Sequence, residues 1–113
     1  MTLRRGDIHW IEFPASSARE EAGRRPAIIV QADAVPALPT VLVVPLTSNP
    51  RASRFPGTFE VEASATTGLH ARSVVPAFQL RAIDRTRVKE RLGCLAPQDL
   101  TTLDAHLRSL LSL

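Results

Sequence analysis

Arginine and hydroxyl side chains gather at the ends of predicted strands, and these residue types suit phosphoryl transfer. Arg24–Arg25 precedes one strand, Thr47–Ser48 follows another, and Gln79 and Arg81 lie two residues apart, on the same side of a third. Negative charge builds on the phosphate oxygens in phosphoryl transfer, where arginine cations and hydroxyl donors can stabilise it. Each residue alone is commonplace, because loop arginines are usually solvated and a threonine at a strand end usually caps it. Phosphoryl transfer is therefore a hypothesis at this point.

Other catalytic classes receive little support from the sequence. The histidines, His9, His70 and His106, show no spacing typical of metal ligands, and Cys94 is the only cysteine. Gly-x-Ser-x-Gly, P-loop and GxGxxG motifs are all absent. The sequence therefore disfavours a metal site, an internal disulfide, a hydrolase triad and a nucleotide cofactor.

The composition is that of one ordinary globular domain. The chain has 113 residues, of which 44% are hydrophobic and 22% charged, so we expect a single domain over residues 1–113. It has no apolar run long enough to span a membrane and no signal-peptide segment after Met1, so we expect a cytoplasmic protein without membrane contact. The net charge is +3, and every basic residue except Lys89 is an arginine, which allows a nucleic-acid partner.

Short strands followed by one helix predict a small barrel with a helix packed on it. Apolar and β-branched runs predict strands over residues 8–13, 27–31, 40–46 and 58–62, and one or two strands over 73–83. Pro97 suits a first helical turn and precedes leucines at helical spacing, which predicts a helix of about fifteen residues. The leucines of this stripe are Leu100, Leu103, Leu107, Leu110 and Leu111.

Several short motifs follow one another in a recognisable order. They are RGDI at 5–8 with Trp10, GRRPAIIVQ at 23–31, VPLTS at 44–48, TGL at 67–69, SVV at 73–75 and QLRAIDR at 79–85, with LG at 92–93. Each motif alone is weak. Their order and spacing over nearly the whole chain resemble the MazF/PemK family of toxins from bacterial toxin–antitoxin modules.

This resemblance implies a fold, an activity and partners. The expected fold is mainly β, an SH3-like small β-barrel of the MazF, PemK and CcdB type with a C-terminal α-helix, and it forms a homodimer. The expected activity is that of a metal-independent, sequence-specific endoribonuclease (an mRNA interferase) without a cofactor. It would cleave single-stranded RNA by attack of a 2′-hydroxyl, giving 2′,3′-cyclic phosphate and 5′-hydroxyl ends. The expected protein partner is a cognate antitoxin whose extended, acidic C-terminal segment occupies the RNA groove.

The resemblance also implies roles for individual residues. Arg25 would neutralise the scissile phosphate and protonate the leaving 5′ oxygen, and Thr47 would donate a hydrogen bond to that phosphate. Ser48 would support Thr47, and Gln79 would lie beside the RNA backbone or a base.

Further arginines are expected to bind RNA. Arg24, Arg51 and Arg54 are candidate phosphate contacts, and Arg81 either binds RNA or pairs with Asp84 to hold the shape of the groove. Trp10 and Phe13 should point to opposite faces of their strand, so at most one of them is expected near RNA. Phe78 is expected to point into the core.

The resemblance does not fix the general base that the 2′-hydroxyl needs. Some relatives use an arginine and an aspartate as acid and base, but this chain has Pro76 and Phe78 at those positions. Glu20 is the candidate catalytic carboxylate, and a solvated loop glutamate is the alternative interpretation. His70 is a minor option, since imidazole suits a base near neutral pH.

Two other functions on the same fold stay open. A related toxin traps DNA gyrase through a C-terminal tail that contains tryptophan, and the tail here, residues 109–113, has none. The other function is a barrel that binds nucleic acid or antitoxin without cutting, which the missing acid–base pair allows. The presence of both Arg25 and Thr47 favours cleavage.

Overall fold

Short antiparallel strands and one C-terminal helix make up the fold, as given by a computed structural model that describes residues 2–14, 23–35 and 38–113. The strands are β1 (Asp7–Phe13), β2 (Gly23–Ile29), β3 (Thr40–Pro45), β4 (Thr58–Val61), β5 (Ser73–Pro76), β6 (Arg81–Asp84) and β7 (Val88–Cys94). The helix is α1 (Pro97–Leu111), and the short 3₁₀ turns are η1 (Pro50–Arg54), η2 (Ala77–Gln79) and η3 (Arg85–Arg87). No helix in this described part of the chain is long and apolar enough to cross a membrane.

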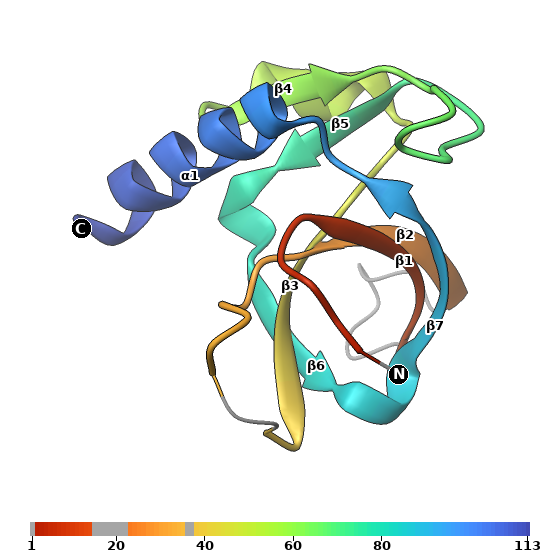
Figure 1. Cartoon of the computed structure of the whole chain (residues 1–113). Coiled ribbons are helices and arrows are strands. Elements are labelled where there is room, and N and C mark those ends of the chain that lie inside the picture. Colours follow the sequence, from red (N-terminus) through yellow and green to blue (C-terminus); the bar gives the residue numbers. More distant parts are fainter. Residues whose placement is uncertain (1, 15–22, 36–37) are drawn as a thin grey trace.

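Five strands form one strongly curled antiparallel sheet in the order β6-β3-β2-β1-β7 (Figure 1). The turn η3 connects the two edge strands, β6 and β7, and Asp84 caps this turn by accepting a hydrogen bond from Thr86 N at 2.9 Å. β4 and β5 form a separate antiparallel pair. The mainly β fold with a C-terminal helix is therefore confirmed.

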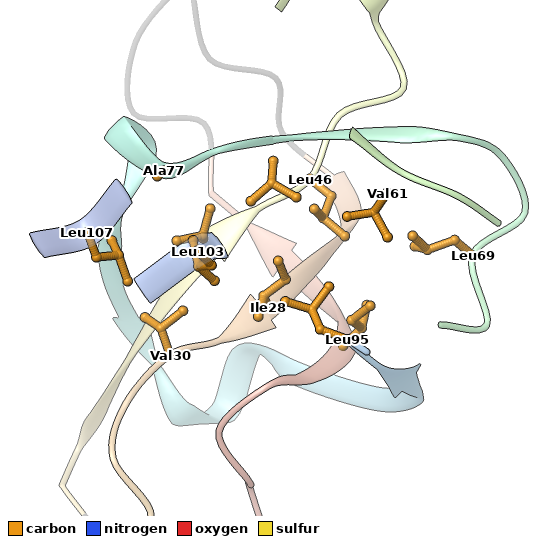
Figure 2. Packing of buried hydrophobic residues seen from close by; sticks show 12 residues of the cluster. Ile28, Val30, Leu46, Val61, Leu69, Ala77, Leu95, Leu103 and Leu107 are labelled. Atoms are coloured by element: carbon orange, nitrogen blue, oxygen red, sulfur yellow. The ribbon is translucent and has the colours of Figure 1, made fainter. Parts of the chain in front are cut away.

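The side chains of β2 alternate between two apolar clusters, which explains how a thin sheet has a core on both faces. Ala27 and Ile29 pack with β1, β3 and β6 inside the curl of the sheet. Ile28, and Val30 directly after β2, face the other way and pack under α1. Figure 2 shows this helix-side cluster, in which Leu103 and Leu107 of α1 lie among strand residues.

The helix begins and ends where the sequence predicts. Pro97 occupies its first turn, and Ser112 ends it in the left-handed conformation with a φ of 57°. Only part of the leucine stripe is covered in this chain: Leu103 and Leu107 are buried, whereas Leu110 and Leu111 are about half exposed. Arg5 ties the helix to the sheet, because it binds Asp104 and donates to the carbonyl oxygen of Val30.

Two predicted strand boundaries are wrong. β2 begins at Gly23, so Arg24 and Arg25 lie inside a strand that pairs with β1, and they do not end a loop. The segment 73–83 is broken by η2, which places Gln79 in a turn, so that Gln79 and Arg81 do not share the face of one strand. The proline at position 76 ends β5 and precedes this turn.

Candidate functional site

An open cavity of about 1080 Å³ lies where the curled sheet meets the β4–β5 pair, and a smaller one of about 370 Å³ adjoins it. The same side chains line both cavities at their junction, namely Arg25, Thr47, Asn49 and Gln79. Arg24, Ser48 and Arg81 line the larger cavity, and Arg51 and Arg54 line the smaller one. Among the described residues that line these cavities, five are arginines and none is acidic. The junction therefore attracts an anion.

A hydrogen bond that Pro26 cannot make positions Arg25 beside the β2–β3 ladder. Leu46 N donates to Pro26 O at 2.9 Å, and two residues that face each other in this way normally also form the reverse N–H···O bond. Pro26 has no N–H to donate, so the carbonyl oxygen of Leu46 accepts instead from Arg25 Nη2 at 3.3 Å. The proline thus leaves an acceptor that draws the guanidinium of Arg25 toward Leu46, the residue before Thr47. Within the described residues, no other side-chain N–H group of Arg25 is bonded.

Thr47 lies at the point where the two sheets are joined. Its backbone bonds in both directions to Val74 of β5, with N···O distances of 3.2 and 2.7 Å. Its hydroxyl oxygen accepts from Asn49 N at 3.1 Å, which occupies a lone pair and leaves the hydroxyl proton for another acceptor. A half-buried, backbone-anchored hydroxyl beside a guanidinium is suited to bind a phosphate oxygen.

Asn49 was not singled out from the sequence as a site residue. This residue lines both cavities, donates its backbone N–H to Thr47, and accepts from Arg51 N at its side chain at 3.0 Å, which caps η1. The signal was present as an asparagine directly before Pro50, a pair that is typical of turn starts.

Phe13 lies between two of the arginines. The guanidinium carbon of Arg25 is 5.7 Å from the centre of this ring, and that of Arg81 is 5.2 Å from it. The ring of Phe13 on β1 therefore supports Arg81 of β6, although β2 and β3 lie between these two strands in the sheet. The predicted pair between Arg81 and Asp84 is wrong, because the Asp84 carboxylate instead accepts hydrogen bonds from the backbone N–H and the hydroxyl of Thr86. These two bonds lower the pKa of Asp84.

Trp10 also lines the larger cavity and contacts two other lining side chains. Arg24 lies over its ring at 5.7 Å, and His70 meets it edge to face with ring centres 6.3 Å apart. Arg24 also binds Glu90, and this hydrogen bond lowers the pKa of that carboxyl group. Trp10 and Phe13 lie three residues apart on β1 and therefore on opposite faces of the strand, yet both line the larger cavity. Both rings are thus part of the candidate site, and which of them lies near RNA stays a prediction.

The prediction that Phe78 is in the core is also wrong. The turn η2 redirects its side chain outward, where it is 40% exposed and packs edge to face on Phe55, with ring centres 5.4 Å apart. Phe55 lines the smaller cavity, and Arg54 lies over its ring at 5.0 Å.

The remaining candidates are placed as follows. Glu20 lies outside the described residues, so its position relative to the site stays a prediction. His70 is exposed and lines the larger cavity. His9 is a core residue, buried in β1, with its Nδ1 atom 2.9 Å from the carbonyl oxygen of Lys89. Within the described ranges, no three His, Cys, Asp or Glu side chains lie close enough to hold a metal ion.

Known proteins resemble this chain in both sequence and fold. The sequence profile of the family described as "PemK-like, MazF-like toxin of type II toxin-antitoxin system" matches residues 4–111. Endoribonuclease MazF2 of Mycobacterium bovis is 30% identical over 115 aligned positions, which cover 100% of both chains. A crystal structure of MazF from Deinococcus radiodurans superposes with a TM-score of 0.77 at 29% identity, covering 100% of this chain and 99% of that one.

A complex of MazE with MazF from the same organism is also similar, with a TM-score of 0.76 at 28% identity, covering 100% of this chain and 98% of the other. The sequence profile spans almost the whole chain, and the structural similarity extends over all of it. This chain belongs to the PemK-like, MazF-like toxin family of type II toxin–antitoxin systems.

Proposed function

We propose that this chain is an endoribonuclease toxin that cleaves single-stranded RNA without a metal ion, using Arg25 and Thr47 at the scissile phosphate. The family supports the class of activity, since curated relatives that align with the whole chain are named endoribonucleases. The observation that carries the site assignment is the position of Arg25 and Thr47 at the junction of two cavities whose described lining is rich in arginine.

The proposed reaction is an internal displacement on phosphorus. The ribose 2′-oxygen forms a bond to the phosphorus while the bond to the 5′-oxygen breaks, and the 2′-proton passes to a base. Arg25 neutralises the charge that builds on the non-bridging oxygens. One of its further N–H groups bonds the leaving 5′-oxygen and gives it a proton, which Arg25 regains from water. Thr47 donates its hydroxyl proton to a non-bridging oxygen. The products are a 2′,3′-cyclic phosphate and a 5′-hydroxyl.

Two side chains are candidates for the base. Glu20 is the first, on the strength of the resemblance alone. His70 lines the same cavity as Arg25 and Thr47 and is steadied by Trp10. Rate profiles against pH for Glu20→Gln and His70→Gln separate them, because removal of the base abolishes the acidic limb of the profile. Removal of a bystander leaves that limb in place.

RNA would bind along both cavities. We propose that Arg24, Arg51, Arg54 and Arg81 bind phosphates and that Ser48 and Gln79 bond the backbone or a base. Removal of one phosphate-binding arginine should reduce the slope of log affinity against log salt by about 0.7. Measured slopes for Arg51→Ala and Arg54→Ala therefore test these two side chains one by one.

The partners follow the same logic. A toxin of a toxin–antitoxin system implies an antitoxin, and an extended acidic segment would complement the arginine-lined cavities. A second copy of the chain is the other proposed partner, and the half-exposed Leu110 and Leu111 of α1 are available for it. Molecular mass in solution, with and without Leu110→Glu, tests the homodimer.

A binding protein that does not cut RNA is the second candidate. It is favoured by one observation, the presence of Pro76 and Phe78 where some relatives have an acid–base pair. Incubation of a long single-stranded RNA with the purified protein in excess EDTA distinguishes the two functions. Recurrent cuts that Arg25→Ala abolishes support the nuclease, whereas bound but intact RNA supports the second candidate.

A further inference from the structure

Two phenylalanines form an exposed aromatic pair at the rim of the smaller cavity. Phe55 and Phe78 are 44% and 40% exposed, whereas phenylalanine side chains are usually buried. Their ring centres are 5.4 Å apart and their planes meet at 63°, so each ring fixes the orientation of the other. The pair holds a large apolar surface in a set position facing solvent.

The aromatic pair adjoins the proposed reaction centre. Phe55 lines the smaller cavity together with Arg25 and Thr47. Phe78 immediately precedes Gln79, which lines both cavities. A nucleotide that flanks the scissile phosphate would therefore lie against these rings.

The surrounding charge indicates what the rings bind. Arg51 and Arg54 line the same small cavity, and Arg54 lies over the Phe55 ring at 5.0 Å. No acidic side chain is among the described residues of this lining. An apolar ring bordered by cations matches a nucleobase joined to phosphates, and aromatic platforms with basic grooves are typical of sites for unpaired nucleic acid.

We propose that Phe55 and Phe78 stack one nucleobase next to the scissile phosphate, while Arg51 and Arg54 bind the adjoining phosphates. This inference rests on the proposed function and adds a base-binding subsite to it. A base can stack on the pair only when it is unpaired, so the subsite selects single strands over duplexes. Stacking tolerates every base, which assigns the sequence preference to other contacts.

A double-mutant cycle between protein and RNA tests the subsite. The probe is a single-stranded oligonucleotide spanning a mapped cleavage site, or one of arbitrary sequence if none is found, with 2′-O-methyl groups to prevent cutting. This oligonucleotide is compared with versions that lack the base at one position, each position being taken in turn. The protein variants are Phe55→Leu, which keeps apolar bulk, Phe55→Trp, which keeps an aromatic face, and Leu42→Ala as a control. Leu42 is 40% exposed and lines neither cavity.

Phe55→Leu should weaken binding of intact RNA by roughly fivefold or more. It should cause no further loss with RNA abasic at one particular position, and Phe55→Trp should retain affinity. Equal losses with intact and every abasic RNA would overturn the proposal, as would unchanged RNA binding with weakened binding of an acidic peptide. The proposed nuclease activity is tested separately. If it is wrong, the wild-type protein leaves RNA without 2′-O-methyl groups intact, while the binding affinities of the double-mutant cycle still measure stacking.

Discussion

Replacement of Pro26 by alanine should loosen Arg25 while adding a hydrogen bond to the sheet. Alanine supplies the N–H that position 26 lacks, and the β2–β3 register directs it at the carbonyl oxygen of Leu46. That oxygen now accepts from Arg25 Nη2 at 3.3 Å, so the new ladder bond competes with the guanidinium. The bond to Arg25 contributes about 1 kcal/mol, which corresponds to a fall in kcat of roughly fivefold.

The assay measures kcat and KM on a single-stranded RNA, together with hydrogen exchange of the amide at position 26. Pro45→Ala is the matched control, because Pro45 pairs with Ala27 at the next ladder position, where N–H groups point away from β2. We expect Pro26→Ala to fold with unchanged or modestly altered stability and a reduced kcat, and Pro45→Ala to keep its kcat. A protected amide at position 26 with an unaltered kcat would refute this role of Pro26.

Three further perturbations probe the site and its support. Thr47→Val should lower kcat roughly 10²-fold with little change in KM, because it removes one donor to the developing charge, whereas Thr47→Ser should retain most activity. Gly68→Ala should lower the free energy of unfolding, measured by denaturant titration, by about 3 kcal/mol or more, because Gly68 has a φ of +69° and a Cβ there would lie 2.1 Å from Leu92 O. Gly57→Ala is the control, since Gly57 has a φ of +75° but open space around it, and it should lower the free energy of unfolding by about 1 kcal/mol. Thr86→Val should raise the pKa of Asp84, because the hydrogen bond from the Thr86 hydroxyl helps to lower this pKa and is lost in the variant. NMR titration of the Asp84 carboxyl carbon measures the change, and an unmoved pKa would contradict this reasoning. The variant should be less stable than wild type at neutral pH, and this difference should vanish as the pH falls through the pKa of Asp84.

Local patterns predicted the elements well where one physical rule acts alone. The helix from Pro97 follows from its leucine spacing, and the capped turn after Asp84 follows from a side chain that bonds its own neighbours. The start of β2 was missed because a proline usually interrupts a strand. Here Pro26 is tolerated because its carbonyl still bonds Leu46 and an arginine replaces the missing donor.

The candidate site was only partly predictable for a similar reason. Arg25, Thr47 and Gln79 line one cavity because three separate segments of the chain meet at the sheet junction. The resemblance to the family indicated that these residues act together, whereas their pattern along the sequence did not. The position of Phe78 depends on the turn η2, and the support of Arg81 comes from Phe13 on a distant strand. Contacts of this kind arise from tertiary packing, so they leave no local signal.

The most direct test of the proposed nuclease is cleavage of a long single-stranded RNA by the purified protein in excess EDTA, beside Arg25→Ala, with chemical analysis of the new ends. We expect cuts at a recurring short sequence, with 2′,3′-cyclic phosphate and 5′-hydroxyl ends, and their loss in Arg25→Ala. Undiminished cleavage by a folded Arg25→Ala protein would contradict the assignment of the site. Intact RNA with the wild-type protein would contradict the nuclease itself.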